Sequence, residues 1–180
     1  MTDDRPKITR VTGPRGESSE FIEMPNRLAQ KAGNFHVDPE GAARVQARLD
    51  ALSERYPEMA QPDFETMVGL WQQLRGSVGG VGDNASFQYL TSLQRVIHDF
   101  KSHGGSVGYP LITEVATALG ELVRRADLAG DMAKQAVDQH VAAIGMILRD
   151  RIAGDGGVSG QGLMSALRLL AARCLAGRAP

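Results

Sequence analysis

The stretch HDFKSHGGSVG, residues 98–108, ends a run of sequence with helical periodicity. Apolar residues precede or overlap it at intervals of three and four, so that they share one helical face: Leu90, Leu93, Ile97 and Phe100. One glycine would suffice to end this helix, yet Gly104 and Gly105 are adjacent, and glycine costs a helix about 1 kcal/mol relative to alanine. The stretch therefore predicts a helix that packs by one face and carries a site on another.

The sequence from residue 38 onward repeats this periodicity in segments separated by turns that contain glycine or proline. Asp38-Pro39-Glu40 has the pattern of a helix start, and Tyr56-Pro57 predicts the end of that helix. Asp63 and Ser159 are expected to cap two later helices. The predicted helices cover residues 38–56, 63–76, 83–104, 110–125, 131–153 and 159–175. No alternating pattern predicts a strand, so we expect an all-α, antiparallel helical bundle.

The first 40 residues differ from the rest of the chain. Residues 1–20, MTDDRPKITRVTGPRGESSE, mix charge, proline and glycine without a sustained period, which is typical of a flexible segment. Phe21, Ile22, Met24 and Leu28 then form an apolar minority, in a tail that packs weakly or in a short docking segment. The expected organisation is a flexible N-terminal tail, 1–40, and a helical bundle, 41–180.

Composition limits the classes of function. The 180-residue chain has a net charge of -1, which gives no electrostatic reason to expect nucleic acid or an anionic membrane as a partner. No secretory signal and no membrane span are recognisable, so a soluble cytoplasmic protein is expected. The single cysteine, Cys174, cannot form an internal disulfide and is interpreted as a small buried hydrophobic residue.

His98 is the candidate functional residue. It lies about 100° around the helix from Ile97, at the edge of the buried face or outside it. Its neighbours at helical spacing are polar or small: Gln94, Arg95, Lys101, Ser102 and Gly105. An exposed imidazole is a nucleophile that can carry a phosphoryl group, and Lys101 is placed to supply the cation that this dianion needs.

The spacing of His98, Phe100, Lys101, Gly105 and Gly108 resembles the signature of histidine phosphotransfer (Hpt) domains. These are four-helix bundles that relay phosphate in bacterial two-component systems. The resemblance implies a four-helix core with additional helices, in which His98 is the phosphoacceptor and Lys101 stabilises the phosphate. It also implies that Gly105 allows close approach and that Gly108 ends the helix.

Two residues depart from the family pattern, in which a glycine and then a small residue usually follow the lysine. Ser102 and His103 occupy these places. Serine is small enough for the site, and His103 lies about 140° around the helix from His98, off the expected docking face.

The resemblance also implies a function and partners. His98 would exchange a phosphoryl group, on Nε2, with the aspartate of a response-regulator receiver domain or with a hybrid histidine kinase. Gln94, Ser102 and Gly105 would form the receiver-docking surface beside Lys101. The receiver would bring Mg²⁺, so the chain needs no cofactor or metal of its own. Since no ATP-binding signature is present, the chain would act as a phosphocarrier rather than a turnover enzyme. It would be a monomer or a homodimer.

Other readings of the polar residues remain open or are weaker. A non-catalytic helical adaptor or scaffold, including a module that binds receivers without accepting phosphate, is the alternative function. His36, His103, His140 and Cys174 are too scattered for a metal cluster, and His103 and His140 are expected at the surface or its edge. The glycine-rich residues 76–84 lack the lysine of a P-loop and are interpreted as a linker. Asp99 and Glu114 show no convincing pairing for acid–base catalysis.

Overall fold

A computed structural model describes residues 7–12, 18–23, 38–76 and 84–176. The chain divides into two compact units, residues 1–42 and 43–180. Several sequence-based expectations concern residues outside the described ones, namely the linker at 77–83, His36 and most of the apolar segment at 21–33.

The described part of the first unit contains a β-hairpin and the first residues of a long helix. Strands β1 (Lys7–Thr12) and β2 (Ser18–Glu23) pair antiparallel, with Lys7 opposite Glu23 and Thr12 opposite Ser18. An ion pair of 2.6 Å joins Arg10 to Glu20 across the strands, and its exposure to solvent limits its contribution to stability. The prediction that the chain contains no strand was therefore wrong, because KITRVT is rich in β-branched residues although they do not alternate.

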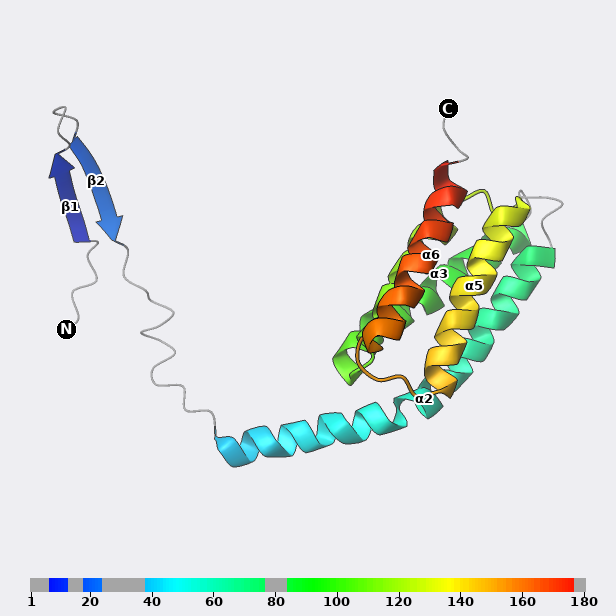
Figure 1. Ribbon diagram of the computed structural model, residues 1–180, viewed down its shortest axis with the longest axis horizontal. Helices are drawn as coiled ribbons and strands as arrows, with labels where there is room; N and C mark the ends of the chain where they lie inside the picture. The colour runs from blue at the N-terminus through cyan, green and yellow to red at the C-terminus, as the bar shows by residue number, and fades with distance from the viewer. Residues whose placement is uncertain (1–6, 13–17, 24–37, 77–83, 177–180) are drawn as a thin grey trace. The chain divides into compact units, whose positions relative to one another are not determined.

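The rest of the described chain forms five α-helices, which confirms the expected all-α bundle (Figure 1). They are α2 (Pro39–Gly76), α3 (Asn84–Gly104), α4 (Pro110–Arg125), α5 (Asp131–Arg149) and α6 (Gly157–Ala176), with a short 3₁₀ turn, η1 (Gly105–Val107), after α3. Helix α4 contacts α3, α5 and α6. Short connections join these successive helices, so sequence neighbours run antiparallel.

The core is apolar and centres on α4. The α4 side chains in this core are Leu111, Ile112, Val115, Ala116, Leu119, Leu122 and Val123. Helix starts at Pro110 and Asp131 agree with the sequence-based expectation. Ser159 does not cap α6, since the helix begins at Gly157, whose N–H donates a 2.9 Å hydrogen bond to Asp155 Oδ1.

Helix α2 replaces two predicted helices, and the predicted break at Tyr56-Pro57 was wrong. It begins as expected, because the N–H groups of Glu40 and Gly41 donate to the Asp38 carboxylate. Pro57 and Pro62 lie inside the helix, which changes direction between its two halves (Figure 1). Asp63 consequently lies within α2 and caps nothing.

Partners outside α2 stabilise the proline-containing segment. Arg151 Nη1 donates a 2.9 Å hydrogen bond to the Glu54 carbonyl, and its Nη2 lies 2.7 Å from Glu58 Oε1. Tyr56 packs on Tyr109 with ring centroids 5.2 Å apart, and burial, with Asp63 and Tyr109, raises the pKa of Tyr56 to about 12. These tertiary contacts hold the proline-containing segment in place, and the Glu54 carbonyl that Arg151 bonds lies next to the Ser53 carbonyl, which loses its helical donor at Pro57.

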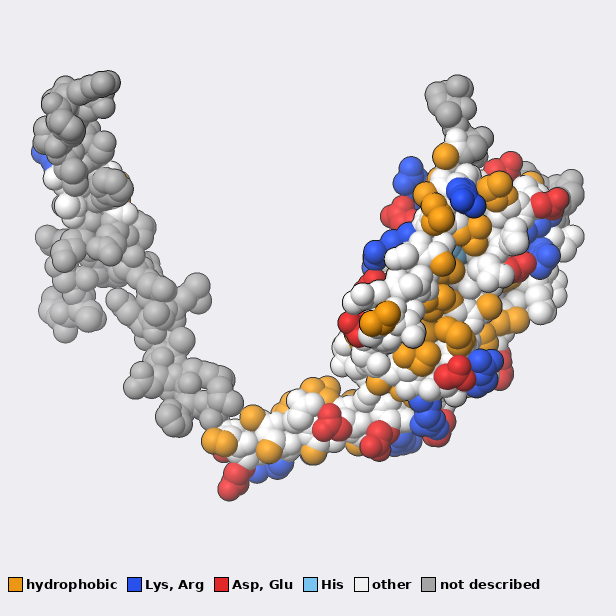
Figure 2. All heavy atoms as spheres, viewed as in Figure 1, with side chains coloured by type: hydrophobic (Ala, Val, Ile, Leu, Met, Phe, Trp, Pro, Cys, Tyr) orange, Lys and Arg blue, Asp and Glu red, His pale blue; other side chains and the backbone are white. Residues whose placement is uncertain are grey.

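The first half of α2 has an apolar side that the described residues leave uncovered. Val45, Leu49 and Leu52 share a face as expected, but they are 59%, 41% and 42% exposed. Figure 2 shows apolar side chains along this part of the helix. The core contacts of α2 begin only at Tyr56, so the second half of the helix is the part that belongs to the bundle.

His140 lies in the core, so the expectation of a surface or edge position was wrong. Its side chain is completely buried on α5, and its Nδ1 lies 2.7 Å from the Ala136 carbonyl oxygen. Nε2 has no hydrogen-bond partner among the described residues, and burial lowers the pKa of the imidazole. Cys174 is only partly buried, although it does pack against the core, and burial raises the pKa of its thiol.

Candidate functional site

Helix α3 presents His98 to solvent. Leu93, Ile97 and Phe100 are buried on the core face of the helix, and His98 is exposed, as the spacing predicts. Ser102 Oγ lies one turn further along the helix, 3.3 Å from His98 Nε2. The serine that departs from the family pattern therefore contacts the candidate nucleophile directly.

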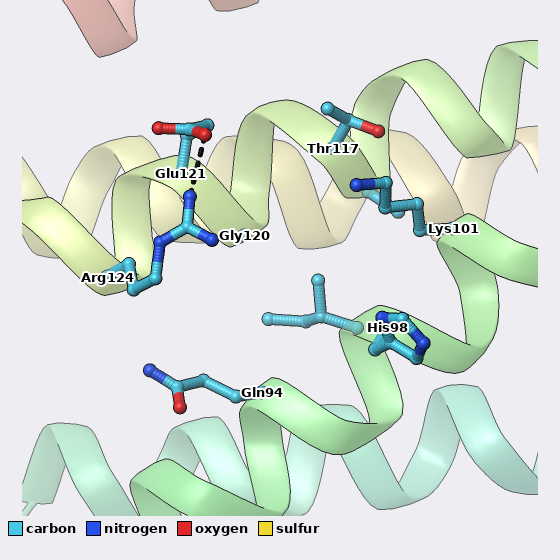
Figure 3. A pocket seen from close by; sticks show the side chains of 9 residues that line it. Gln94, His98, Lys101, Thr117, Gly120, Glu121 and Arg124 are labelled. Atoms are coloured by element: carbon cyan, nitrogen blue, oxygen red, sulfur yellow. Dashed lines mark hydrogen bonds and ion pairs between the residues drawn. The ribbon is translucent and has the colours of Figure 1, made fainter.

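His98 lines a groove between α3 and α4 that has a volume of about 190 Å³ (Figure 3). From α3 it is lined by Gln94, Ile97, His98 and Lys101, and from α4 by Ala116, Thr117, Gly120, Glu121 and Arg124. Three predicted site residues, Gln94, His98 and Lys101, are thus brought together. The α4 side of the groove was not predicted, because no spacing within one helix indicates which residues of the next helix lie opposite.

Two cationic side chains, one from each helix, line the groove. The Lys101 ammonium group comes from α3, and the Arg124 guanidinium group comes from α4 and extends beside Gly120 (Figure 3). Arg124 Nη2 also donates to Glu121 Oε1 at 2.6 Å, while Glu121 Oε2 lies 3.8 Å from Arg125 Nη1. Neutral Gln94 and Thr117 complete the polar lining. An anion bound in this groove would meet positive charge from both sides.

Ser102 and Gly105, expected on the docking surface, are exposed but do not line the groove. The Gly105 N–H donates to Thr113 Oγ1 at 2.8 Å, and that hydroxyl donates to the Lys101 carbonyl at 3.1 Å. One threonine of α4 thereby joins the backbone on both sides of the end of α3. This linkage fixes the turn of helix that carries Lys101.

The glycines at the end of α3 have different structural roles. Gly108 takes a left-handed conformation, with φ of 87°, and ends the 3₁₀ turn η1, whereas α3 itself ends earlier, at Gly104. Gly104, which is not part of the family pattern, is buried, and a Cβ atom there would lie 3.0 Å from both Thr113 Oγ1 and the Tyr109 carbonyl oxygen. A Cβ atom on Gly105 would make only an ordinary 3.4 Å contact. Close approach between helices therefore depends on Gly104.

We expect Gly104→Ala to lower the free energy of unfolding by about 1–2 kcal/mol, because the added methyl group meets a backbone carbonyl that already accepts a hydrogen bond from the Ile112 N–H. The matched change Gly105→Ala should alter stability by less than about 0.5 kcal/mol. Urea titrations of both variants measure the two values. Equal stabilities would contradict the assignment of the close contact to Gly104.

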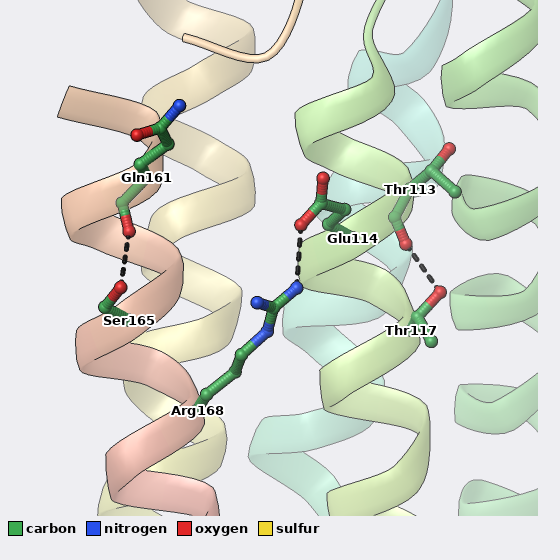
Figure 4. Close-up of polar contacts among 6 residues, drawn as sticks. All are labelled: Thr113, Glu114, Thr117, Gln161, Ser165 and Arg168. Carbon is green, nitrogen blue, oxygen red and sulfur yellow. Dashed lines mark hydrogen bonds and ion pairs between the residues drawn. The ribbon is translucent and has the colours of Figure 1, made fainter. Parts of the chain in front are cut away.

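A second groove, with a volume of about 530 Å³, lies between α4 and α6 and shares Thr117 and Glu121 with the first. Its polar feature is an ion pair of 2.9 Å between Glu114 and Arg168 (Figure 4). Glu114 is thus paired with an arginine and lies away from the His98 groove. Glu114 and Glu121 are therefore two acidic residues of the same helix that each pair with an arginine.

Comparisons with known proteins give no information about this site. No protein-family model, curated protein or solved structure matches the chain. Within the described ranges, no three His, Cys, Asp or Glu residues are grouped so that they could hold a metal ion. None of the described helices is both long and apolar enough to cross a membrane.

Proposed function

We propose that this chain is a histidine phosphotransfer protein that carries a phosphoryl group on His98. The observation that supports this most strongly is the groove itself, in which an exposed imidazole lies with Lys101 and Arg124 from two packed helices. Of these two cations, only Lys101 belongs to the sequence motif. A phosphoryl dianion on His98 would have both within the same groove.

The proposed step uses Nε2 of His98 as the nucleophile. With the ring proton on Nδ1, Nε2 carries a lone pair, and the Ser102 hydroxyl, 3.3 Å away, can donate a hydrogen bond to it. As Nε2 bonds to phosphorus, the bond from phosphorus to the receiver aspartate breaks, and its electron pair returns to the carboxylate. The reverse step passes the group to an aspartate. Ser102 therefore orients the ring until phosphorus replaces its hydrogen bond.

The partner in this proposal is a response-regulator receiver domain, which brings the acceptor aspartate and Mg²⁺. The chain contributes the oriented imidazole, the two cations and the exposed surface around Gln94, Ser102 and Gly105. This division of roles accounts for a groove that is open to solvent, because the phosphoryl donor is another protein.

The test incubates the full chain with receiver domains that have been loaded with labelled acetyl phosphate. We expect label to move to the chain, and to be lost in acid but retained in base, as a phosphoramidate requires. A panel of receiver domains covers differences in pairing specificity. Absence of label with every loaded receiver would contradict phosphotransfer and leave a binding-only module.

A further inference from the structure

The His98 groove contains a carboxylate, which a site for a phosphoryl dianion does not need. Glu121 is the one acidic residue among those that line the groove. It lies on the α4 wall beside Arg124, with which it forms an ion pair of 2.6 Å (Figure 3). A negative charge at this place opposes the accumulation of a second, larger negative charge on His98.

We propose that Glu121 is a positioning residue that keeps phosphate on His98 transferable, by repelling it and by competing with it for Arg124. This inference rests on the proposed function of His98. It concerns how the phosphoryl group is divided at equilibrium between this chain and a receiver, rather than whether the group can be accepted.

The competition follows from the contacts of Arg124. Without phosphate, the Arg124 guanidinium group donates to Glu121, which also lies 3.8 Å from Arg125. A phosphoryl group on His98 would draw the same guanidinium group into the groove, because arginine binds phosphate strongly. Phosphorylation therefore weakens the ion pair between Arg124 and Glu121, and this cost lowers the stability of the phosphorylated form.

The exposure of these groups sets the size of the effect. The Arg124 and Glu121 side chains are 60% and 48% exposed, so solvent screens their charges. We expect removal of the Glu121 charge to shift the exchange equilibrium toward phosphorylated His98 about three- to tenfold. A shift of this size changes how much phosphate the chain stores without altering its fold.

The experiment compares Glu121→Gln with the matched variant Glu114→Gln. Both remove one exposed carboxylate of α4 that pairs with an arginine, but only Glu121 lines the His98 groove. Each protein is equilibrated with a receiver domain that labels the wild type, and the label on both partners is counted. The equilibrium constant calculated from the label on both partners should shift about three- to tenfold toward the chain with Glu121→Gln and keep the wild-type value with Glu114→Gln.

Ionic strength provides a readout that a purely structural effect would not change. The difference between Glu121→Gln and wild type should shrink toward zero at about 1 M salt, where charges are screened within a few ångströms. If both variants behave alike, or if Glu121→Gln lowers the label, the inference about Glu121 fails while the proposed function stands. If the wild type takes no label from any receiver, the proposed function itself fails.

Discussion

His98→Gln is expected to abolish phosphorylation of the chain and to leave its fold intact. Glutamine keeps polarity and approximate size but has no nucleophilic nitrogen, so no phosphoramidate can form. The side chain is exposed, and its polar contact is with Ser102, which is also exposed. Circular dichroism and urea titration should therefore give wild-type values, while label from a loaded receiver falls to background.

The matched control for this change is His103→Gln. His103 is also exposed and lies near the same end of α3, but it does not line the groove. Its replacement should leave phosphorylation at the wild-type level. Label that persists in the His98 variant and disappears in the His103 variant would move the acceptor to His103 and contradict the assignment.

Sequence periodicity predicted the parts of the fold that depend on single helices. The start of α2 depends on the Asp38 carboxylate and the start of α4 has Pro110, and both features are local. The exposure of His98 likewise follows from its angle relative to Ile97 on one helix. Signals of this kind depend only on residues close together in the sequence and not on the packing of neighbouring helices.

The continuity of α2 could not be predicted in this way. Pro57 removes a backbone donor and would normally end a helix. Here contacts from far along the chain hold this segment in place, since Arg151 bonds the Glu54 carbonyl and Tyr109 packs on Tyr56. A distant arginine that supports a proline-containing helix leaves no mark in the local sequence.

The α4 wall of the groove was missed for a related reason. Thr117, Glu121 and Arg124 recur on one side of α4, but which side faces His98 depends on how α3 and α4 pack. That packing depends on Gly104 and on Thr113, which bridges the Gly105 N–H and the Lys101 carbonyl. The second cation of the site is therefore a property of the helix pair rather than of the motif.

The burial of His140 did have a signal in the sequence. Ala136, Val137, Val141 and Ile144 are buried at helical spacing around it, so His140 falls within their stripe. Polarity argued for the surface, but position on the helix argued for the core, and position was correct. A histidine in this place has a consequence for stability.

Acidification below about pH 6.5 is expected to destabilise the protein through His140. Burial disfavours the imidazolium form and lowers the pKa of His140 from its ordinary value of 6.5. The unfolded chain therefore binds this proton at a higher pH than the folded chain does. The contribution of neutral His140 to the free energy of unfolding is fully present above about pH 6.5. It declines as the pH falls from there toward the lowered pKa, by at most about 1.4 kcal/mol per pH unit.

His140→Leu isolates this contribution, because leucine fills similar volume and cannot be protonated. Urea titrations between pH 7.5 and about pH 5 should show a falling free energy of unfolding for the wild type and for His103→Gln, whose histidine is exposed. The leucine variant should lose most of this slope, whatever its stability at neutral pH. An unchanged slope in His140→Leu would show that another group is responsible. Because Nε2 of His140 has no partner among the described residues, a proton added there meets no described acceptor, which is why burial controls the sign.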